Sequence, residues 1–134
     1  MASFLAPLID GLGARYLLRN QRTQLPLAAE LEPAFDSRRR RRGLLGRTQL
    51  DRGAAMILAP CSSVHTFFMR FPIDVVFVCR RGSVVKVCAH LQPWRIAVAW
   101  RAYAAIELPA GVAAESGIER GDLLQLKPRD SMSG

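Results

Sequence analysis

The chain has 134 residues and half of them are hydrophobic, which suits one compact domain with a single buried core. Its formal net charge of +8 is uneven, because five positive charges come from an arginine run at residues 38–42. Charged residues and prolines interrupt every apolar stretch before it reaches the roughly 20 residues needed to cross a bilayer, so the pattern argues against a membrane-spanning helix.

The first 15 residues carry apolar side chains at helical spacing. They are Phe4, Leu5, Leu8, Ile9 and Leu12. This spacing predicts either a short amphipathic helix or a poorly ordered leader before the domain begins at residue 16. A secretory signal is disfavoured, because the segment lacks a basic start and carries Asp10 within its apolar part.

The three cysteines, Cys61, Cys79 and Cys88, form no CxxC pair, and any disulfide would leave one thiol over. This usage is typical of a reducing compartment, where a buried cysteine acts as a small apolar residue. His65 and His90 share no metal-ligand spacing with the thiols. We therefore expect a cytoplasmic protein without a bound metal or cofactor.

The first predicted strands are two short apolar segments at residues 16–18 and 25–31. A polar break at residues 20–23 separates them and can turn the chain back. The pattern predicts a β-hairpin, which Glu32 and Pro33 are expected to end.

A helix is predicted next, over residues 37–45. Asp36 or Ser37 can cap its start by accepting hydrogen bonds from exposed amides. Gly46 is expected to end it. Because arginines in the first turns oppose the helix dipole, the start is expected to fray and the run to remain in water.

The arginine run also has a functional interpretation. It comprises Arg38, Arg39, Arg40, Arg41 and Arg42. These side chains could grip the phosphates of nucleic acid or an anionic lipid surface. No zinc finger, RNP-like motif or aromatic-interleaved basic stripe accompanies the run, so a solvated helix face is the favoured interpretation.

The middle of the chain is predicted to build the core. Residues 54–58 are a short apolar segment and residues 64–69 carry bulky β-forming side chains, while residues 74–79 and 84–90 are predicted to form a hairpin around a turn at residues 80–83. The segments VVFVC and VVKVC are apolar at nearly every position. Both strands of this hairpin are therefore expected to be covered on both faces.

An apolar segment at residues 97–105 leads into the strand AAIELP, in which Ile106 and Leu108 face one way and Glu107 the other. Pro109 and the residues after it are expected to stop this strand.

The last elements are one or two helical turns at residues 112–116, with Gly117 as a left-handed C-cap, and a strand at residues 123–126. The tail at residues 128–134 is polar and expected to be mobile. Short strands punctuated by glycine and proline favour a mainly β domain. We expect a compact single domain of sandwich, jelly-roll-like or barrel-like type with two short helices.

Five motifs in order resemble the domain-of-unknown-function 192 (DUF192) family. They are GLLGR (residues 43–47), VHTFFMRFPIDVVF (64–77), VCRRGSVVKV (78–87), ELPAG (107–111) and SGIERGDLL (116–124). The resemblance covers about residues 16–127 and implies a mainly β single domain found in bacteria and archaea. It implies no reaction, because none is assigned to the family. The hairpin turn, often acidic in relatives, is Cys79-Arg80-Arg81-Gly82 here, so cation binding at that turn is disfavoured.

The segment CSSVHTFFMRFPIDVVF (residues 61–77) holds the residues most worth testing for function, although each has a structural explanation. The ring of His65 can be satisfied by backbone groups at a strand end. The large apolar side chains are expected in the core: Phe67, Phe68, Met69 and Phe71. Asp74 heads a buried strand and must find partners, for which loop amides, Arg95 or Arg101 would suffice.

Two functional classes remain open, and the favoured one is a β-sandwich binding module for a small or anionic ligand or a protein partner. Its candidate contacts are His65, Phe68, Met69, Trp94, Arg95 and Trp100. The alternative is a hydrolase-type enzyme in which Asp74 or Glu107 orients His65 as a general base. Cys61 or a nearby hydroxyl would be its nucleophile, although no GxSxG or HExxH motif supports this class.

Overall fold

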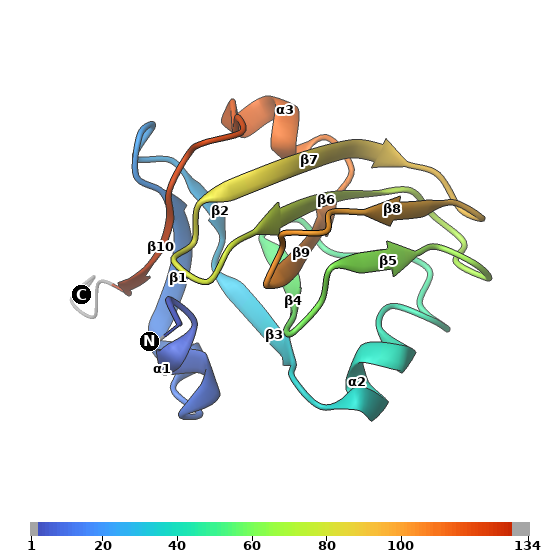
Figure 1. Ribbon diagram of the computed structural model, residues 1–134, viewed down its shortest axis with the longest axis horizontal. Coiled ribbons are helices and arrows are strands. Elements are labelled where there is room, and N and C mark those ends of the chain that lie inside the picture. Colours follow the sequence, from blue (N-terminus) through green and yellow to red (C-terminus); the bar gives the residue numbers. More distant parts are fainter. Residues whose placement is uncertain (1–2, 130–134) are drawn as a thin grey trace.

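A five-stranded sheet forms the centre of the computed structural model, which describes residues 3–129 (Figure 1). In spatial order its strands are β3 (Glu30–Ala34), β4 (Ala54–Leu58), β9 (Ala104–Pro109), β6 (Ile73–Val78) and β7 (Val84–Leu91). β3 runs parallel to β4, and the other neighbours are antiparallel. Every residue of β6 and β9 is buried, so these strands lie in the middle of the core.

Two smaller sheets complete the fold. One has the order β10-β1-β2 and consists of β1 (Tyr16–Asn20), β2 (Pro26–Ala28) and β10 (Leu124–Pro128). The other is a ribbon of β5 (Ser63–His65) and β8 (Ile96–Val98). Figure 1 shows the three-stranded sheet and the ribbon toward opposite ends of the molecule.

The helical elements are short: α1 (Ala6–Ile9), the 3-10 turn η1 (Gly13–Arg15), α2 (Ser37–Arg42) and α3 (Val112–Ser116). None of the helices within residues 3–129 is long and apolar enough to cross a membrane. The predicted mainly β single domain with short helices is confirmed, and the strands described do not close into a barrel.

The central sheet carries one apolar cluster on each face, as the alternation in β9 predicted. Ile106 and Leu108 belong to a cluster with residues of α1, the three-stranded sheet and α3. The opposite cluster joins β4 and β6 to the loop after α2 and to the ribbon. Glu107 faces this second cluster, because side chains alternate along a strand and its register partner Val75 belongs there.

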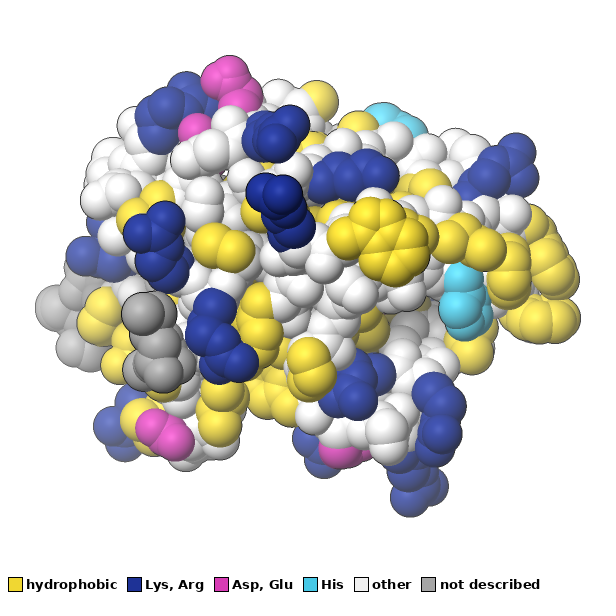
Figure 2. Space-filling model, viewed as in Figure 1, with side chains coloured by type: hydrophobic (Ala, Val, Ile, Leu, Met, Phe, Trp, Pro, Cys, Tyr) yellow, Lys and Arg dark blue, Asp and Glu magenta, His cyan; other side chains and the backbone are white. Residues whose placement is uncertain are grey.

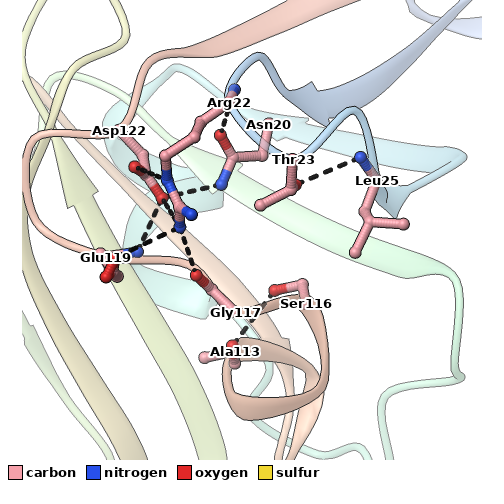
Figure 3. A network of polar contacts seen from close by, with 9 residues as sticks. All are labelled: Asn20, Arg22, Thr23, Leu25, Ala113, Ser116, Gly117, Glu119 and Asp122. Carbon is pink, nitrogen blue, oxygen red and sulfur yellow. Dashed lines mark hydrogen bonds and ion pairs between the residues drawn. The ribbon is translucent and has the colours of Figure 1, made fainter.

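A polar clamp joins the β1–β2 turn to the loop after α3 (Figure 3). The carboxylate of Asp122 accepts hydrogen bonds from Arg22 Nε (2.7 Å), Asn20 Nδ2 (2.8 Å) and the backbone amide of Glu119 (2.8 Å). Arg22 also donates to the Gly117 carbonyl at 2.7 Å. The hydrogen bonds from Arg22 hold the pKa of Asp122 well below its usual range. The clamp therefore stabilises the ionised carboxylate.

The predicted N-terminal hairpin is correct for its first two strands and wrong for its end. β1 pairs antiparallel with β2, but residues 30–34 form a separate strand, β3, in the central sheet. Pro33 does not stop this strand, because β3 lies at the edge of the sheet. A proline has no amide hydrogen to donate, but at the sheet edge no neighbouring strand needs that donor.

The predicted helix at residues 37–45 is too long. Asp36 caps its start as expected, since its Oδ1 accepts a 2.7 Å hydrogen bond from the Arg39 amide. The helix ends at Arg42, and Gly43 turns the chain at a φ of 47°. This early end lets Leu44 enter the second apolar cluster.

The hairpin of β6 and β7 is confirmed, but the expectation that both strands are covered on both faces is wrong for β7. Several β7 residues are partly or fully exposed, whereas β6 is buried throughout. β7 is an edge strand, and an apolar sequence alone could not distinguish it from its central neighbour.

Other boundaries also shift. The β-forming segment at residues 64–69 contributes only to the short strand Ser63–His65, which begins one residue earlier, and Ile96–Val98 and Ala104–Pro109 form separate strands. The helical turns at Val112–Ser116 and the left-handed Gly117 (φ of 67°) are confirmed. The last strand is Leu124–Pro128 rather than residues 123–126. The tail expected to be mobile comprises residues 128–134, and its part from residue 130 onward lies outside the described residues.

Candidate functional site

A pocket of about 390 Å³ opens between α2 and the ribbon, on the Glu107 face of the central sheet. One wall is formed by the end of α2 and the loop after it, and the other by the connection between β4 and β5. Apolar side chains of Leu44, Leu58 and Met69 line it together with polar groups. The early end of α2 creates this wall, because Leu44 packs inward while the preceding arginines remain at the rim.

Glu107 is the buried charge of this pocket. Its side chain is 4% exposed, and Oε1 has no hydrogen-bond partner within the described part of the chain. Burial raises the pKa of the Glu107 carboxyl to about 7, although nearby Arg47 acts in the opposite direction. Near neutral pH this carboxyl can therefore either donate or accept a hydrogen bond.

Arginines from α2 form the basic rim. Arg40 is half-buried, and its Nη1 donates to the carbonyls of Phe35 (2.8 Å) and Ala59 (3.3 Å). Arg41 and Arg42 also line the pocket but are exposed, and across residues 3–129 neither guanidinium group makes a hydrogen bond or ion pair. Two guanidinium groups are therefore available at the pocket mouth.

Cys61 and His65 line the same pocket. The Cys61 thiol donates to the Ser63 carbonyl at 3.1 Å, and burial raises its pKa. A thiol of this kind is a poor nucleophile near neutral pH. His65 Nδ1 accepts a 3.3 Å hydrogen bond from the Phe67 amide, and its ring stacks on the Phe67 ring.

Asp74 lies on the opposite face of the sheet and does not reach the pocket. Its Oδ1 accepts from the His90 amide (2.8 Å), and its Oδ2 accepts from the amides of Gly111 (3.0 Å) and Ala113 (2.8 Å). Backbone amides are thus its partners, as considered from the sequence, although those of His90 and Ala113 belong to β7 and α3 rather than to a loop. Arg95 and Arg101 are exposed and do not pair with it. The structure therefore does not bring Asp74 to His65.

The other sequence candidates divide between the pocket and the surface. Met69 and His65 line the pocket, whereas Phe68, Trp94, Arg95 and Trp100 do not. Phe68, expected in the core, is 70% exposed. Sequence analysis did not assign Arg41 and Arg42 to a pocket. The signal that could have located them is the GLLGR motif, whose first glycine ends the helix.

No group of three histidine, cysteine or acidic side chains in the described ranges is arranged to hold a metal ion. The side chains that line the pocket supply a buried carboxyl, free guanidinium groups, one imidazole and apolar surface. Such a set can bind an anion and fix the orientation of a second polar group.

Comparison with known proteins first identifies two solved structures. One is a protein of unknown function from Novosphingobium aromaticivorans, with 27% identity, a TM-score of 0.65 and coverage of 71% of this chain and 73% of the other. The second, from Sinorhizobium meliloti, is provisionally described as a transcription regulator. It has 20% identity and a TM-score of 0.73, and the match covers 84% of this chain and 94% of the other, so it shows the fold alone.

Sequence comparison gives the family. A UPF0127 protein of Pyrococcus furiosus is 40% identical over 65 residues, which covers 48% of this chain and 55% of the relative. The chain thus matches about half the length of this curated relative. The model of DUF192, described as an uncharacterized ACR, matches residues 18–126. Since this match spans most of the sequence, the chain belongs to the DUF192 family.

Proposed function

We propose that this protein is a binding module for a small organic anion. The ligand places its acidic group on Arg41 and Arg42 and a hydrogen-bonding group on Glu107. The observation that carries the proposal is the buried Glu107 carboxyl, whose Oε1 lacks a protein partner in the described residues and which lines the arginine-rimmed pocket.

The physical argument starts from the cost of an unpaired polar group. A buried group without a hydrogen-bond partner costs about 1–3 kcal/mol, so a ligand that supplies the partner recovers that free energy. The pocket volume of about 390 Å³ suits a small metabolite. The apolar side chains that line the pocket with these groups, Leu44, Leu58 and Met69, favour a short apolar spacer between the ligand's two polar groups.

The test is a thermal-shift screen of matched compounds. Small hydroxycarboxylic acids and phosphate monoesters are compared with neutral amides and alcohols of the same skeleton. A ligand at 100 times its Kd stabilises the native state by about 2.7 kcal/mol, which raises Tm by roughly 10 °C for a domain of this size. We expect such shifts from the anions and none from their neutral analogues.

Variants then locate the site. Glu107→Gln and the pair Arg41→Gln and Arg42→Gln should remove most of the ligand-induced shift. Arg38→Gln is the matched control, because Arg38 lies on the same helix but does not line the pocket. If the anions shift the Glu107 and arginine variants as much as the parent, the proposed site is wrong.

One observation supports an enzyme as a second candidate. A carboxyl whose pKa is about 7 matches the requirements of a general acid–base, and His65 lines the same pocket. A hydrolase-type reaction would then use Glu107 rather than the His65–Asp74 pair. Hydrolysis of p-nitrophenyl phosphate and p-nitrophenyl acetate checks this, because a rate that Glu107→Gln leaves unchanged would contradict the assignment.

A further inference from the structure

Three large apolar side chains protrude where β5 ends and β8 begins; we call Phe68, Trp94 and Ile96 the aromatic tip. They are 70%, 55% and 61% exposed, respectively. The ring centroids of Phe68 and Trp94 are 4.6 Å apart, and the ring of Phe67 stacks on that of Trp94 with a centroid distance of 5.9 Å. Figure 2 shows hydrophobic side chains gathered at the corresponding right-hand end of the molecule.

The two loops that carry the tip are tied together by Thr66, which is fully buried. Its Oγ1 donates to the Gln92 carbonyl (2.6 Å) and accepts from the Arg95 amide (2.9 Å). Its carbonyl accepts a 2.9 Å hydrogen bond from the Trp94 amide. These bonds fix both loops, so the exposed position of the rings is part of the folded structure.

The backbone at the tip is also strained. Phe68 and Trp94 have φ values of 66° and 67°, in the left-handed region that bulky residues rarely occupy. Strained residues persist where the surrounding structure enforces them, and they concentrate at functional positions. Here the left-handed backbone conformation accompanies two aromatic rings that are exposed to solvent rather than buried in the core.

The exposed charged residues next to the tip in sequence are basic. Between Arg52 and Ile106 the only acidic residue is Asp74, which is fully buried on the other side of the sheet. Arg70 and Arg95 flank the tip and are exposed. Across the pocket from His65, the exposed arginines of α2 add further positive charge. Figure 2 shows basic side chains over α2, beside the hydrophobic end of the molecule.

We propose that the aromatic tip docks on an anionic phospholipid membrane. Phe68, Trp94 and Ile96 enter the interfacial region, while Arg70 and Arg95 contact the headgroup phosphates. Aromatic and aliphatic side chains beside arginines are the combination that interfacial membrane binding uses. No transmembrane segment is involved, and the proposal is independent of the ligand pocket.

Other occupants fit these observations less well. A stable protein interface buries about 800 Å² per partner and involves about 20–30 residues on each side, far more than the three exposed side chains of the tip. Single-stranded nucleic acid needs a basic groove along its backbone and aromatic faces free for stacking. The Trp94 ring instead already packs against the rings of Phe67 and Phe68.

The experiment measures binding to phosphatidylcholine vesicles with and without phosphatidylglycerol. The chain has two tryptophans, Trp94 and Trp100, so Trp100→Phe leaves Trp94 as the only reporter and Trp94→Phe leaves Trp100. We expect binding only to vesicles that contain phosphatidylglycerol. Emission from Trp94 should shift to shorter wavelength, whereas that from Trp100, beyond the other end of β8, should not.

Variants complete the test. Phe68→Ser combined with Trp94→Ser should weaken vesicle binding about tenfold or more, and Arg70→Gln combined with Arg95→Gln should do the same. The control is Ile9→Ser, which removes another exposed apolar side chain (54%) from α1 and should bind like the parent. Quenching of Trp94 by brominated lipid in the Trp100→Phe protein keeps the test valid should the double serine variant fail to fold.

Three results overturn the proposal: no binding to the anionic vesicles, binding that the tip variants do not weaken, or unchanged Trp94 emission on bound protein. A single-stranded oligonucleotide serves as the competing ligand. If the tip variants lose affinity for the oligonucleotide and retain it for vesicles, the surface binds nucleic acid and membrane docking is wrong.

Discussion

Replacing Asp74 with asparagine tests whether this carboxylate is structural. The side chain is fully buried and accepts three backbone hydrogen bonds, one through Oδ1 and two through Oδ2. In Asp74→Asn the amide oxygen can keep the pair from Gly111 and Ala113. The new NH₂ group then faces the His90 amide, so two donors meet and that amide loses its acceptor.

The magnitude follows from that count. The loss of one hydrogen bond to a charged group, with two donors left facing each other, costs about 2–3 kcal/mol. For a domain of this size, that cost lowers Tm by roughly 10 °C. The loss acts at the start of α3 and the end of β7, the two elements that the carboxylate joins.

Urea denaturation followed by circular dichroism measures the free energy of unfolding. Asp10→Asn is the matched control, because it removes the same charge from an exposed position and should leave stability unchanged. Ligand-induced stabilisation should be the same in Asp74→Asn and the parent, since Asp74 does not line the pocket. An Asp74→Asn protein that unfolds at the urea concentration of the parent would refute this reasoning.

Three further predictions concern protonation and backbone geometry. Because the pKa of Glu107 is raised from 4.5 to about 7, the folded protein retains a proton that the unfolded chain releases, so stability should fall by about 3 kcal/mol as pH rises between those values. Urea titrations across this range should show that Glu107→Gln removes the slope; an unchanged slope would point to another group. The lowered pKa of Asp122 means that its contribution is present above the ordinary aspartate value of 3.8 and is lost as pH falls toward the folded-state pKa. Thermal melts should therefore show that Asp122→Asn destabilises the protein at neutral pH and less so in strong acid, and an equal loss at both would contradict the linkage. Gly82→Ala should destabilise by about 3 kcal/mol, because the new Cβ would lie 2.5 Å from the Leu124 carbonyl oxygen at a φ of 96°. Gly46→Ala is its control in chemical denaturation: with a φ of 84° and no atom near the Cβ position, it should cost only about 1 kcal/mol, and equal losses would show that the close contact is unimportant.

Local sequence signals predicted the elements that local physics determines. The apolar segment Ala54–Leu58 is a buried strand, and Gly117 ends α3 in the left-handed conformation that was expected because it lacks a side chain. The alternation of Ile106, Glu107 and Leu108 correctly predicted opposite faces for the acid and its neighbours. These features depend on a few adjacent residues.

Features that depend on long-range pairing could not be obtained in this way. β3 joins β4 in parallel across the helix and loop between them, and nothing in residues 30–34 specifies that partner. The sequence also could not show which of two valine-rich strands lies at the sheet edge. β6 is buried because a strand pairs with it on each side, whereas β7 is partly exposed because it pairs with β6 alone.

The candidate site was predicted only in part, for a similar reason. His65, Met69 and Glu107 were selected as chemical residues, and all three line the pocket. The position of the basic rim depends on where α2 ends. The helix prediction placed this end three residues too late. Phe68 was expected in the core because large aromatic residues usually are, and its positive φ is a property of the folded loop.

The central claim is that the buried carboxyl of Glu107 forms a hydrogen bond with a polar group of the ligand. Carbon-13 NMR titration of that carboxyl tests this claim most directly. The titration is run on the free protein and with the anion that raises Tm most in the screen. We predict a pKa of about 7 in the free protein and a clear change when the anion is bound. A carboxyl that titrates at the ordinary glutamate value of 4.5 and does not respond to the anion would contradict the account.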